Sequence, residues 1–274
     1  RPVGLVRGLT ADGFYTTDDF TYENGVYTLK KGVPDVTSAV FPNYHLHSGM
    51  NERPAGQLAY PGMAKFKDLN DDGFINDDDV DVIGDMTPIH TGGFNINATY
   101  KNFDLGLYFN WSYGNEIYNV NKLAALYGYK EGAVYENKLS IVKDCYKIYD
   151  VVNGELVALT TPEQLNAANA NAKLPLAYSE NGYVSTLGIE DGSYLRLNTL
   201  TLGYTLPKSV LQKAGISNLR IYGSIYNVFT ITGYSGIDAE VSTSTSTKTY
   251  PQLGMDWGTY PRARSFVLGV NLSF

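Results

Sequence analysis

Several residue types are scarce in this 274-residue sequence, and each shortage excludes a class of protein. Its one cysteine, Cys145, rules out an intrachain disulfide and therefore a secreted disulfide scaffold. We expect Cys145 to be a buried, idle thiol, because the three histidines lie far from it in the sequence. Lysine and arginine number 21 against 28 acidic residues, which is the opposite of the balance that nucleic-acid binding needs.

Long apolar runs and catalytic motifs are also missing. No stretch of about 18 apolar residues occurs, so the sequence predicts no transmembrane helix. Residues 1–15 lack the apolar stretch and cleavage site of a signal peptide, so we expect further sequence upstream. No glycine-flanked nucleophilic serine or phosphate-binding glycine loop occurs, and Glu131, Glu136 and Glu155 fall in loops without a partner pattern. We predict that the chain is not an enzyme.

What the sequence does contain is a set of runs in which apolar and polar side chains alternate. In the first run, Phe94 and Ile96 share one face while Asn95 and Asn97 share the other, which is the period of a β-strand. The runs cover about residues 93–101, 103–113, 192–206, 219–230 and 262–274. The first two are separated by so short a turn that they predict a β-hairpin.

The third run changes phase within its length. Leu195 and Leu197 do not share the parity of Leu200 and the alternating residues that follow it. This break predicts a β-bulge near Asn198 or Thr199, because one extra residue moves later side chains to the opposite face.

Strand length and loop length together favour a membrane barrel over a soluble sheet. Most of the runs are about 9 to 13 residues long, enough to cross a bilayer at a tilt, whereas about 5 or 6 is usual in soluble sheets. Connections are short at one end and long at the other, and Tyr100, Tyr113 and Phe274 place aromatic rings near strand ends. The sequence therefore predicts an all-β fold, an antiparallel transmembrane β-barrel.

The number of strands implies missing sequence. Five is odd, whereas bacterial single-chain barrels close with an even number, because an open edge cannot face lipid. We therefore expect more strands upstream and the first residue on the extracellular side. This divides the chain into an extracellular loop region, 1–92, and a barrel region, 93–274. Within the second, we predict extracellular loops at 114–191 and 231–261, helices near 120–127 and 165–173, and one helical turn within 207–218.

A series of sequence blocks, in this order, resembles a known family. The blocks are Phe66 to Gly73, Val82 to Gly84, Gly93-Phe94, Tyr100 to Leu105, Ser112 to Asn119, Asp191 to Leu197, Leu200 to Tyr204, Arg220 to Tyr222, Asn227 to Thr230, and Tyr260 to Phe274. They cover roughly the last three quarters of the chain and are similar to the SusC/RagA family of TonB-linked outer membrane proteins. One departure is Asp71, which stands where the family loop often carries glycine and should strain the turn slightly.

The resemblance implies both a fold and a function. Such transporters resemble barrels of about 22 strands with a plugged lumen, of which this chain would supply the last five. It implies TonB-dependent active import of oligosaccharides or peptides across the outer membrane of a Gram-negative bacterium. It further implies a SusD-like surface lipoprotein as a lid, contact with TonB through an N-terminal part not visible here, and outer-membrane lipid around the barrel.

An acidic loop at residues 68–79 has the spacing of a calcium-binding loop, with Gly73 at the sharp turn. Its ligands, in order, would be Asp68, Asn70, Asp72, the backbone carbonyl of Phe74, Asn76 and Asp79. Asp79 replaces the usual glutamate, and its shorter arm should lower the affinity for Ca²⁺, although weak sites serve in extracellular modules. The alternative is an acidic, solvated turn held by local Asx hydrogen bonds.

Other functions stay open on the sequence alone. Residues 68–84 also resemble half of a dockerin, which would make the chain an extracellular docking module, although a dockerin usually needs two such loops. A soluble carbohydrate-binding module would use the loop tyrosines, unless these rings only pack: Tyr127, Tyr129, Tyr135, Tyr178, Tyr183, Tyr234, Tyr250 and Tyr260. His45 and His47 could form a metal pair on a strand or a solvated pair in a loop.

Overall fold

The structure is a computed structural model that describes residues 4–38, 40, 53–127, 138–177, 184–211, 215–241, 254–258 and 260–274. It divides into two compact units. The first, here called the sheet unit, comprises Arg1–Gly4, Asp85–Tyr118 and Glu190–Phe274. The second, here called the core unit, comprises Leu5–Gly84 and Asn119–Ile189. Among the described residues, no helix has the length and apolarity needed to span a membrane.

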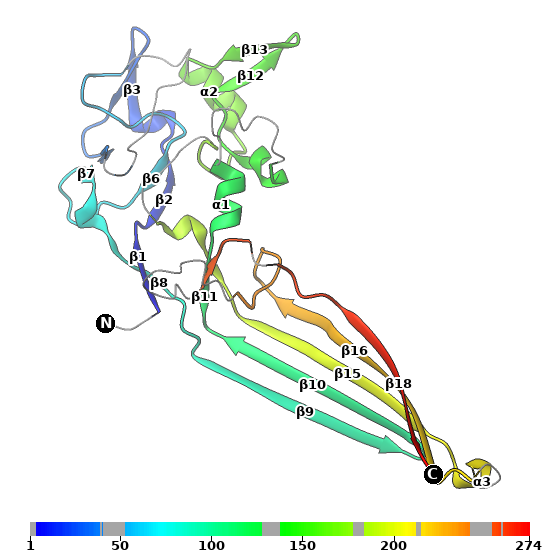
Figure 1. The fold of residues 1–274 in the computed structure, drawn as a ribbon. Helices are drawn as coiled ribbons and strands as arrows, with labels where there is room; N and C mark the ends of the chain where they lie inside the picture. The colour runs from blue at the N-terminus through cyan, green and yellow to red at the C-terminus, as the bar shows by residue number, and fades with distance from the viewer. Residues whose placement is uncertain are drawn as a thin grey trace. The chain divides into compact units, whose positions relative to one another are not determined.

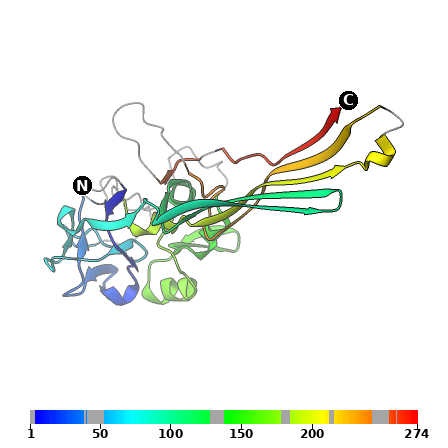
Figure 2. The ribbon, with the colours of Figure 1, turned by 90° about the horizontal axis from the view of Figure 1, so that it is seen from below.

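The sheet unit is built on one antiparallel sheet of five long strands (Figures 1 and 2). In chain order these are β9 (His90–Tyr100), β10 (Phe103–Tyr113), β15 (Tyr194–Thr205), β16 (Asn218–Thr232) and β18 (Ser265–Ser273). Their order across the sheet is β18-β16-β15-β10-β9. The five alternating runs of the sequence therefore form the predicted strands, and each is hydrogen-bonded to its neighbour in the chain.

Short connections gather at one end of this sheet and long ones at the other (Figure 1). At the first end, Lys101 and Asn102 join β9 to β10, and a segment containing the helical turn α3 (Lys208–Leu211) joins β15 to β16. Lys101 has a φ of 52°, the left-handed conformation that a tight hairpin turn demands. The chain ends there as well (Figure 1).

The predicted bulge is confirmed at Asn198. Tyr108 of β10 pairs with Thr199, whereas the next residue, Phe109, pairs with Leu197, so Asn198 is skipped in the ladder. The extra residue returns Leu197 to the face that carries Leu200. The bulge therefore keeps one face apolar along the whole length of β15.

That apolar face is open to the surroundings in the described residues. Leu268 is 89% exposed, Phe266 71% and Ile231 62%, and many other outward side chains of the five strands are exposed too. Soluble monomers rarely expose so many large apolar side chains on one face of a sheet. The sheet thus has one face that is suited to contact with hydrocarbon.

A smaller sheet has most of its residues in the sheet unit. It has the strand order β14-β11-β17, with β11 at Glu116–Asn119, β14 at Ile189–Asp191 and β17 at Met255–Asp256. Beside it, Ile117, Tyr234 and Ala239 form a small buried cluster. The segment that follows β16 is thereby packed against the sheet unit rather than left in solvent.

The core unit consists of short elements around one apolar core. Its strands are β1 (Leu5–Gly8), β2 (Ala11–Phe14), β3 (Phe20–Glu23), β4 (Val26–Leu29), β5 (Asp35–Val36), β6 (Ala64–Phe66), β7 (Phe74–Ile75), β8 (Asp81–Asp85), β12 (Tyr149–Val152) and β13 (Glu155–Ala158). Its helices are α1 (Val120–Tyr127) and α2 (Pro162–Asn169), with 3-10 turns η1 (Thr17–Asp19), η2 (Asp77–Asp79), η3 (Ser140–Asp144) and η4 (Thr186–Gly188).

Tyrosines connect the distant segments of this core. Tyr15 and Tyr27 are fully buried, and burial raises the pKa of both hydroxyls. Each hydroxyl still donates a hydrogen bond to a backbone carbonyl, Tyr15 to Pro34 at 2.6 Å and Tyr27 to Thr160 at 3.0 Å. Buried phenols need such a partner. These two of the 23 tyrosines are therefore structural.

The two compact units do not coincide with the division into residues 1–92 and 93–274 that the sequence suggested. Residues 119–189, predicted to be a long loop, share a compact unit with residues 5–84. Ile148, Leu159 and Leu165 are buried in the same core as Tyr15 and Phe66. The strands that carry this core have two to five residues each, too few for a period of two to stand out in the sequence.

The two helices were predicted with different accuracy. The helix near 120–127 is confirmed as α1, whereas α2 begins at Pro162, three residues before the predicted start. Its start is fixed by a capping box, in which Thr161 Oγ1 accepts the Gln164 N–H at 3.4 Å and Gln164 Oε1 accepts the Thr161 N–H at 3.2 Å. The sequence signal was Thr-Pro-Glu-Gln, and it was overlooked.

The packing of this core leads us to expect that truncating two phenylalanines will change the stability by different amounts. Phe66 is fully buried and Phe74 is 53% exposed. Phe66→Ala should lower the free energy of unfolding by about 3–5 kcal/mol, because it leaves a cavity. Phe74→Ala should change it by about 0.5 kcal/mol or less. Denaturant titration followed by tyrosine circular dichroism measures both, and equal losses in the two variants would contradict this core.

Candidate functional site

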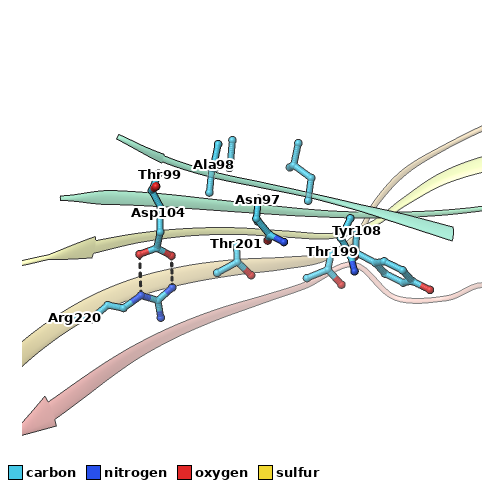
Figure 3. Close-up of a pocket in the computed structure, with 12 residues that line it drawn as sticks. Asn97, Ala98, Thr99, Asp104, Tyr108, Thr199, Thr201 and Arg220 are labelled. Atoms are coloured by element: carbon cyan, nitrogen blue, oxygen red, sulfur yellow. Dashed lines mark hydrogen bonds and ion pairs between the residues drawn. The ribbon is translucent and has the colours of Figure 1, made fainter. Parts of the chain in front are cut away.

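The face of the sheet opposite the apolar one is polar and hollowed. A hollow of about 350 Å³ lies on this inner face, across β9, β10, β15 and β16 (Figure 3). Its polar side chains are Asn95, Asn97, Thr99, Asp104, Tyr108, Thr199, Thr201 and Arg220. All of these occupy strand positions opposite the apolar face, as the sequence predicted for Asn95 and Asn97, so the strand period itself builds the site.

An ion pair crosses this inner face. Arg220 of β16 donates from Nε to Asp104 Oδ1 at 2.9 Å and from Nη2 to Asp104 Oδ2 at 2.5 Å (Figure 3). Two parallel bonds of this kind fix the guanidinium and the carboxylate in one plane. Arg220 also lies 4.8 Å from the centre of the Tyr222 ring, a cation–π contact. The pair thus connects two strands that are not hydrogen-bonded neighbours.

Gly203 makes room for this pair. It lies on β15 between the two partners, opposite Asp104 on one side and Tyr222 on the other. A Cβ atom at this position would lie 2.4 Å from Asp104 Oδ1 and 2.5 Å from Arg220 Nη2. Both distances are shorter than any normal contact, so a side chain at Gly203 would displace the ion pair.

The rest of this inner face offers hydroxyls and amides. Thr201 Oγ1 and Ser224 Oγ lie 2.8 Å apart across β15 and β16. The charges of Asp104 and Arg220 are satisfied by each other, so neither group is arranged as a catalytic acid or base. The arrangement can exchange hydrogen bonds with water or with an uncharged polar solute.

Sequence reasoning missed this ion pair for a geometric reason. Asp104 and Arg220 are 116 positions apart, and their meeting depends on the registers of β10, β15 and β16 together. The sequence did contain a signal for this pair, because Asp104 and Arg220 carry opposite charges and both lie on the polar side of predicted strands. Placing them in contact requires the strand registers, which alternation does not give.

The acidic loop closes on itself through backbone N–H groups. Asp68 Oδ2 accepts the Gly73 N–H at 2.8 Å, and Asp72 Oδ1 accepts the Phe74 N–H at 2.8 Å. The Phe74 N–H contributes most to lowering the pKa of Asp72, followed by the side-chain amides of Asn70 and Asn76, so this carboxylate stays charged at a pH where ordinary aspartates begin to protonate. Asp71 has a φ of 58°, which confirms the expected strain where the family loop often has glycine.

The end of the loop is held by Asp79. Its side chain is fully buried and accepts the Leu69 N–H at 2.7 Å and the Asn76 N–H at 2.9 Å. Asn76 in turn accepts the Asp78 N–H at 2.7 Å. Within the described ranges, no three His, Cys, Asp or Glu side chains converge as a ready metal-binding group. Calcium binding by this loop therefore stays a prediction.

The remaining candidate residues have mixed outcomes. His45, His47, Tyr129, Tyr135, Tyr178, Tyr183, Tyr250, Glu131 and Glu136 lie outside the described residues, as does the side chain of Tyr127. Tyr234 is buried and donates to Asp256 Oδ2 at 2.6 Å, whereas Tyr260 is 87% exposed. Cys145 is 4% exposed, and burial, together with Asp144, raises its pKa to about 11. Cys145 is thus buried, as the sequence predicted.

Comparison with known proteins finds similar sequences among TonB-dependent receptors. No protein-family model matches the chain. The TonB-dependent receptor P3 of Formosa agariphila is 33% identical over 219 residues, 78% of this chain and 19% of that protein. The TonB-dependent receptor P26 of the same organism is 29% identical over 78% of this chain and 20% of that protein. The TonB-dependent receptor SusC of Bacteroides thetaiotaomicron is 33% identical over 136 residues, 47% of this chain and 12% of that protein.

Solved structures agree on the fold. The RagAB peptide importer in its closed-closed state matches with a TM-score of 0.61 and 20% identity, over 98% of this chain and 23% of that chain. Another structure, of the RagAB peptide transporter, matches with a TM-score of 0.56 and 24% identity, over 73% of this chain and 19% of that chain. The fold is thus that of part of a TonB-dependent transporter barrel.

The particular family follows from the sequence matches. The chain belongs to the SusC/RagA-like TonB-dependent transporters, as the resemblance indicated. It spans about a fifth of the length of the first curated relatives that it matches. These relatives are receptors and transporters and not enzymes, which agrees with the prediction that the chain is not an enzyme. The dockerin-like alternative leaves the five long strands unexplained.

Because Gly203 is crowded and Gly106 is not, valine should have different effects on stability at these two positions of the inner face. Gly203→Val should destabilise the folded barrel by about 1–3 kcal/mol, because the side chain would separate Asp104 from Arg220. Gly106→Val is the matched control, since the nearest atom to its added Cβ is Asn97 Oδ1 at 3.4 Å.

Urea unfolding of the complete transporter in detergent, followed by the heat-dependent shift on electrophoresis, measures both variants. Equal midpoints for Gly203→Val and the wild type would contradict the crowding at this position.

Proposed function

We propose that the chain is part of an outer-membrane importer that takes up oligosaccharides or peptides by TonB-dependent active transport. The observation that supports this most is the two-faced sheet, apolar and exposed on one side, polar and hollowed on the other. An apolar outer band around a polar interior is the arrangement that a β-barrel needs to carry polar solutes through a bilayer. The family membership gives this arrangement its transport role.

The connections suggest the orientation in the membrane. Outer-membrane barrels place short turns in the periplasm and long loops outside the cell. By this rule the turn at Lys101 and Asn102 is periplasmic, while the connections from β10 to β15 and from β16 to β18 are extracellular. A SusD-like lipoprotein would bind there as a lid, and TonB would act from the periplasm.

The names of the relatives do not agree on one class of substrate. Two solved relatives are named a peptide transporter and a peptide importer, whereas the SusC relative is named only as a TonB-dependent receptor. Both oligosaccharides and peptides are polar enough to need a wet pathway. The inner face described above, with hydroxyls, amides and one neutralised ion pair, suits either of them.

Uptake in the source bacterium tests this function. Deleting the gene should abolish uptake of at least one fluorescent oligosaccharide or peptide, and restoring it should return the uptake. A protonophore should stop that uptake as completely as the deletion, because TonB transmits the proton-motive force. The gene carrying Leu268→Arg should fail to complement, since arginine facing lipid near the bilayer midplane costs about 2–4 kcal/mol. Uptake that is unaffected by deletion or by the protonophore would contradict the proposal.

We also propose that residues 68–79 bind Ca²⁺ at the extracellular surface. Each carboxylate oxygen that accepts one N–H keeps a second lone pair for a cation. The hydrogen bonds to Asp68, Asp72 and Asp79 already fix these side chains in place. A bound ion would stiffen the surface on which a lid docks.

Calorimetry on the complete transporter, after treatment with a chelator, tests this loop. Calcium should bind with a dissociation constant of about 10⁻⁴ to 10⁻³ M, the range of extracellular sites. Asp72→Asn should weaken binding, because it removes one of the charged ligands. Asp71→Asn, the adjacent residue outside the ligand set, should leave it unchanged. The idea fails if the wild type takes up no calcium, or if both variants behave alike.

A further inference from the structure

A second hollow of the sheet unit lies on the outer, apolar face, at the end where the long connections begin (Figure 1). Its volume is about 450 Å³, within the usual size of small-molecule sites. Its apolar walls are Trp111, Tyr113, Leu195 and Ile231. We propose that this hollow holds one acyl chain of a glycolipid in the outer leaflet of the outer membrane. The inference rests on the membrane location and orientation proposed above.

The hollow is built on one row of side chains across three strands. Trp111 on β10 pairs with Leu195 on β15, and Leu195 pairs with Ile231 on β16. Gly233 follows on the same alternate set as Ile231 and also lines the hollow. A Cβ atom at Gly233 would have no atom within 4 Å. The hollow is therefore open beside the row because Gly233 contributes no side chain.

The aromatic wall of the hollow is held in a fixed position. Trp111 Nε1 donates to His90 Nδ1 at 3.0 Å, and the His90 ring stacks on Tyr113 with 5.1 Å between the ring centres. A Cβ atom at Gly92 would lie 2.4 Å from the Trp111 ring, so the indole lies against the backbone of β9. A chain in the hollow contacts ordered walls on several sides, whereas a chain on a flat surface contacts one side only. Dispersion contacts add up with the number of touching atoms.

The polar groups of the hollow are already hydrogen-bonded within the chain. Ser193 Oγ accepts the Gly114 N–H at 2.9 Å, and Asp191 Oδ1 accepts the Ser193 N–H at 2.9 Å. Thr232 Oγ1 donates to the Ser193 carbonyl at 2.8 Å. What these groups leave between them is mainly apolar surface. The hollow therefore favours an occupant that needs no hydrogen bonds of its own, such as a hydrocarbon chain.

The position of the hollow favours a glycolipid as the source of that chain. It is continuous with the apolar face, which contacts lipid in a membrane barrel. By the proposed orientation this end lies in the outer leaflet, which in Gram-negative bacteria consists mainly of acylated sugars. Asp191, Ser193 and Thr232 line the hollow at the strand ends, where their remaining lone pairs can accept sugar hydroxyls. No lysine or arginine is among the described lining residues, so a phosphate finds no partner there.

Lipid titration of the complete transporter tests the proposal. The transporter is stripped of lipid in detergent and titrated with lipid A or with phosphatidylethanolamine, and native mass spectrometry counts the bound molecules. Gly233→Phe should fill the hollow without displacing an atom, because the space at its Cβ is open. It should weaken lipid A binding about fivefold, which corresponds to roughly ten lost dispersion contacts. The heat-dependent electrophoretic shift verifies that the variant is folded.

Gly223→Phe is the matched control, because it places the same ring on the same strand and face but outside the hollow. Its Cβ would lie 3.4 Å from Leu268, an ordinary contact, so it should bind lipid A as the wild type does. Equal lipid A binding by Gly233→Phe and the wild type, or no binding by either, would overturn the site. A loss of phosphatidylethanolamine alone in Gly233→Phe would overturn the glycolipid assignment. Protonophore-sensitive uptake is measured separately, so the import function can stand when this site fails.

Discussion

The need to pair backbone N–H and C=O groups within a sheet is the constraint on which the rest of this structure depends. In hydrocarbon no water can satisfy an unpaired group, so strands must be long, antiparallel and continuous across the membrane. Continuous pairing also sends alternate side chains to opposite faces. The bulge at Asn198 shows how strictly the faces are kept, because the extra residue returns Leu197 to the apolar side while the ladder continues.

Charges on the inner face are neutralised by local partners. Asp104 and Arg220 meet over Gly203, and Arg196 is enclosed by Asp238 and Glu240. Both arginines are anchored on the long strands, and each connects segments that the backbone ladder does not join. Such pairs leave the inner surface polar yet without free charge at these positions. A surface of this kind offers hydrogen-bonding groups, and not free charges, to a solute at these positions.

The sequence predicted the long strands well because their signal is strong. A period of two over nine or more residues is hard to produce otherwise, and the break in phase at Leu197 located the bulge. The core unit was not predicted, because Tyr15, Phe66 and Leu165 come from short segments that lack any period. The ion pair between Asp104 and Arg220 was missed since it depends on three registers. Alternation reveals which face a side chain occupies, but not its neighbours on that face.

Accessibility of two adjacent positions on β9 tests the two-faced sheet most directly. Nitroxide labels at Ile96→Cys and Asn97→Cys, each on a Cys145→Ser background of the complete transporter in a lipid bilayer, can be compared by electron paramagnetic resonance. The label at position 96 should collide mainly with oxygen dissolved in lipid, and the label at 97 mainly with a water-soluble nickel chelate. Identical collision patterns at the two positions, or a reversed pair, would contradict the account.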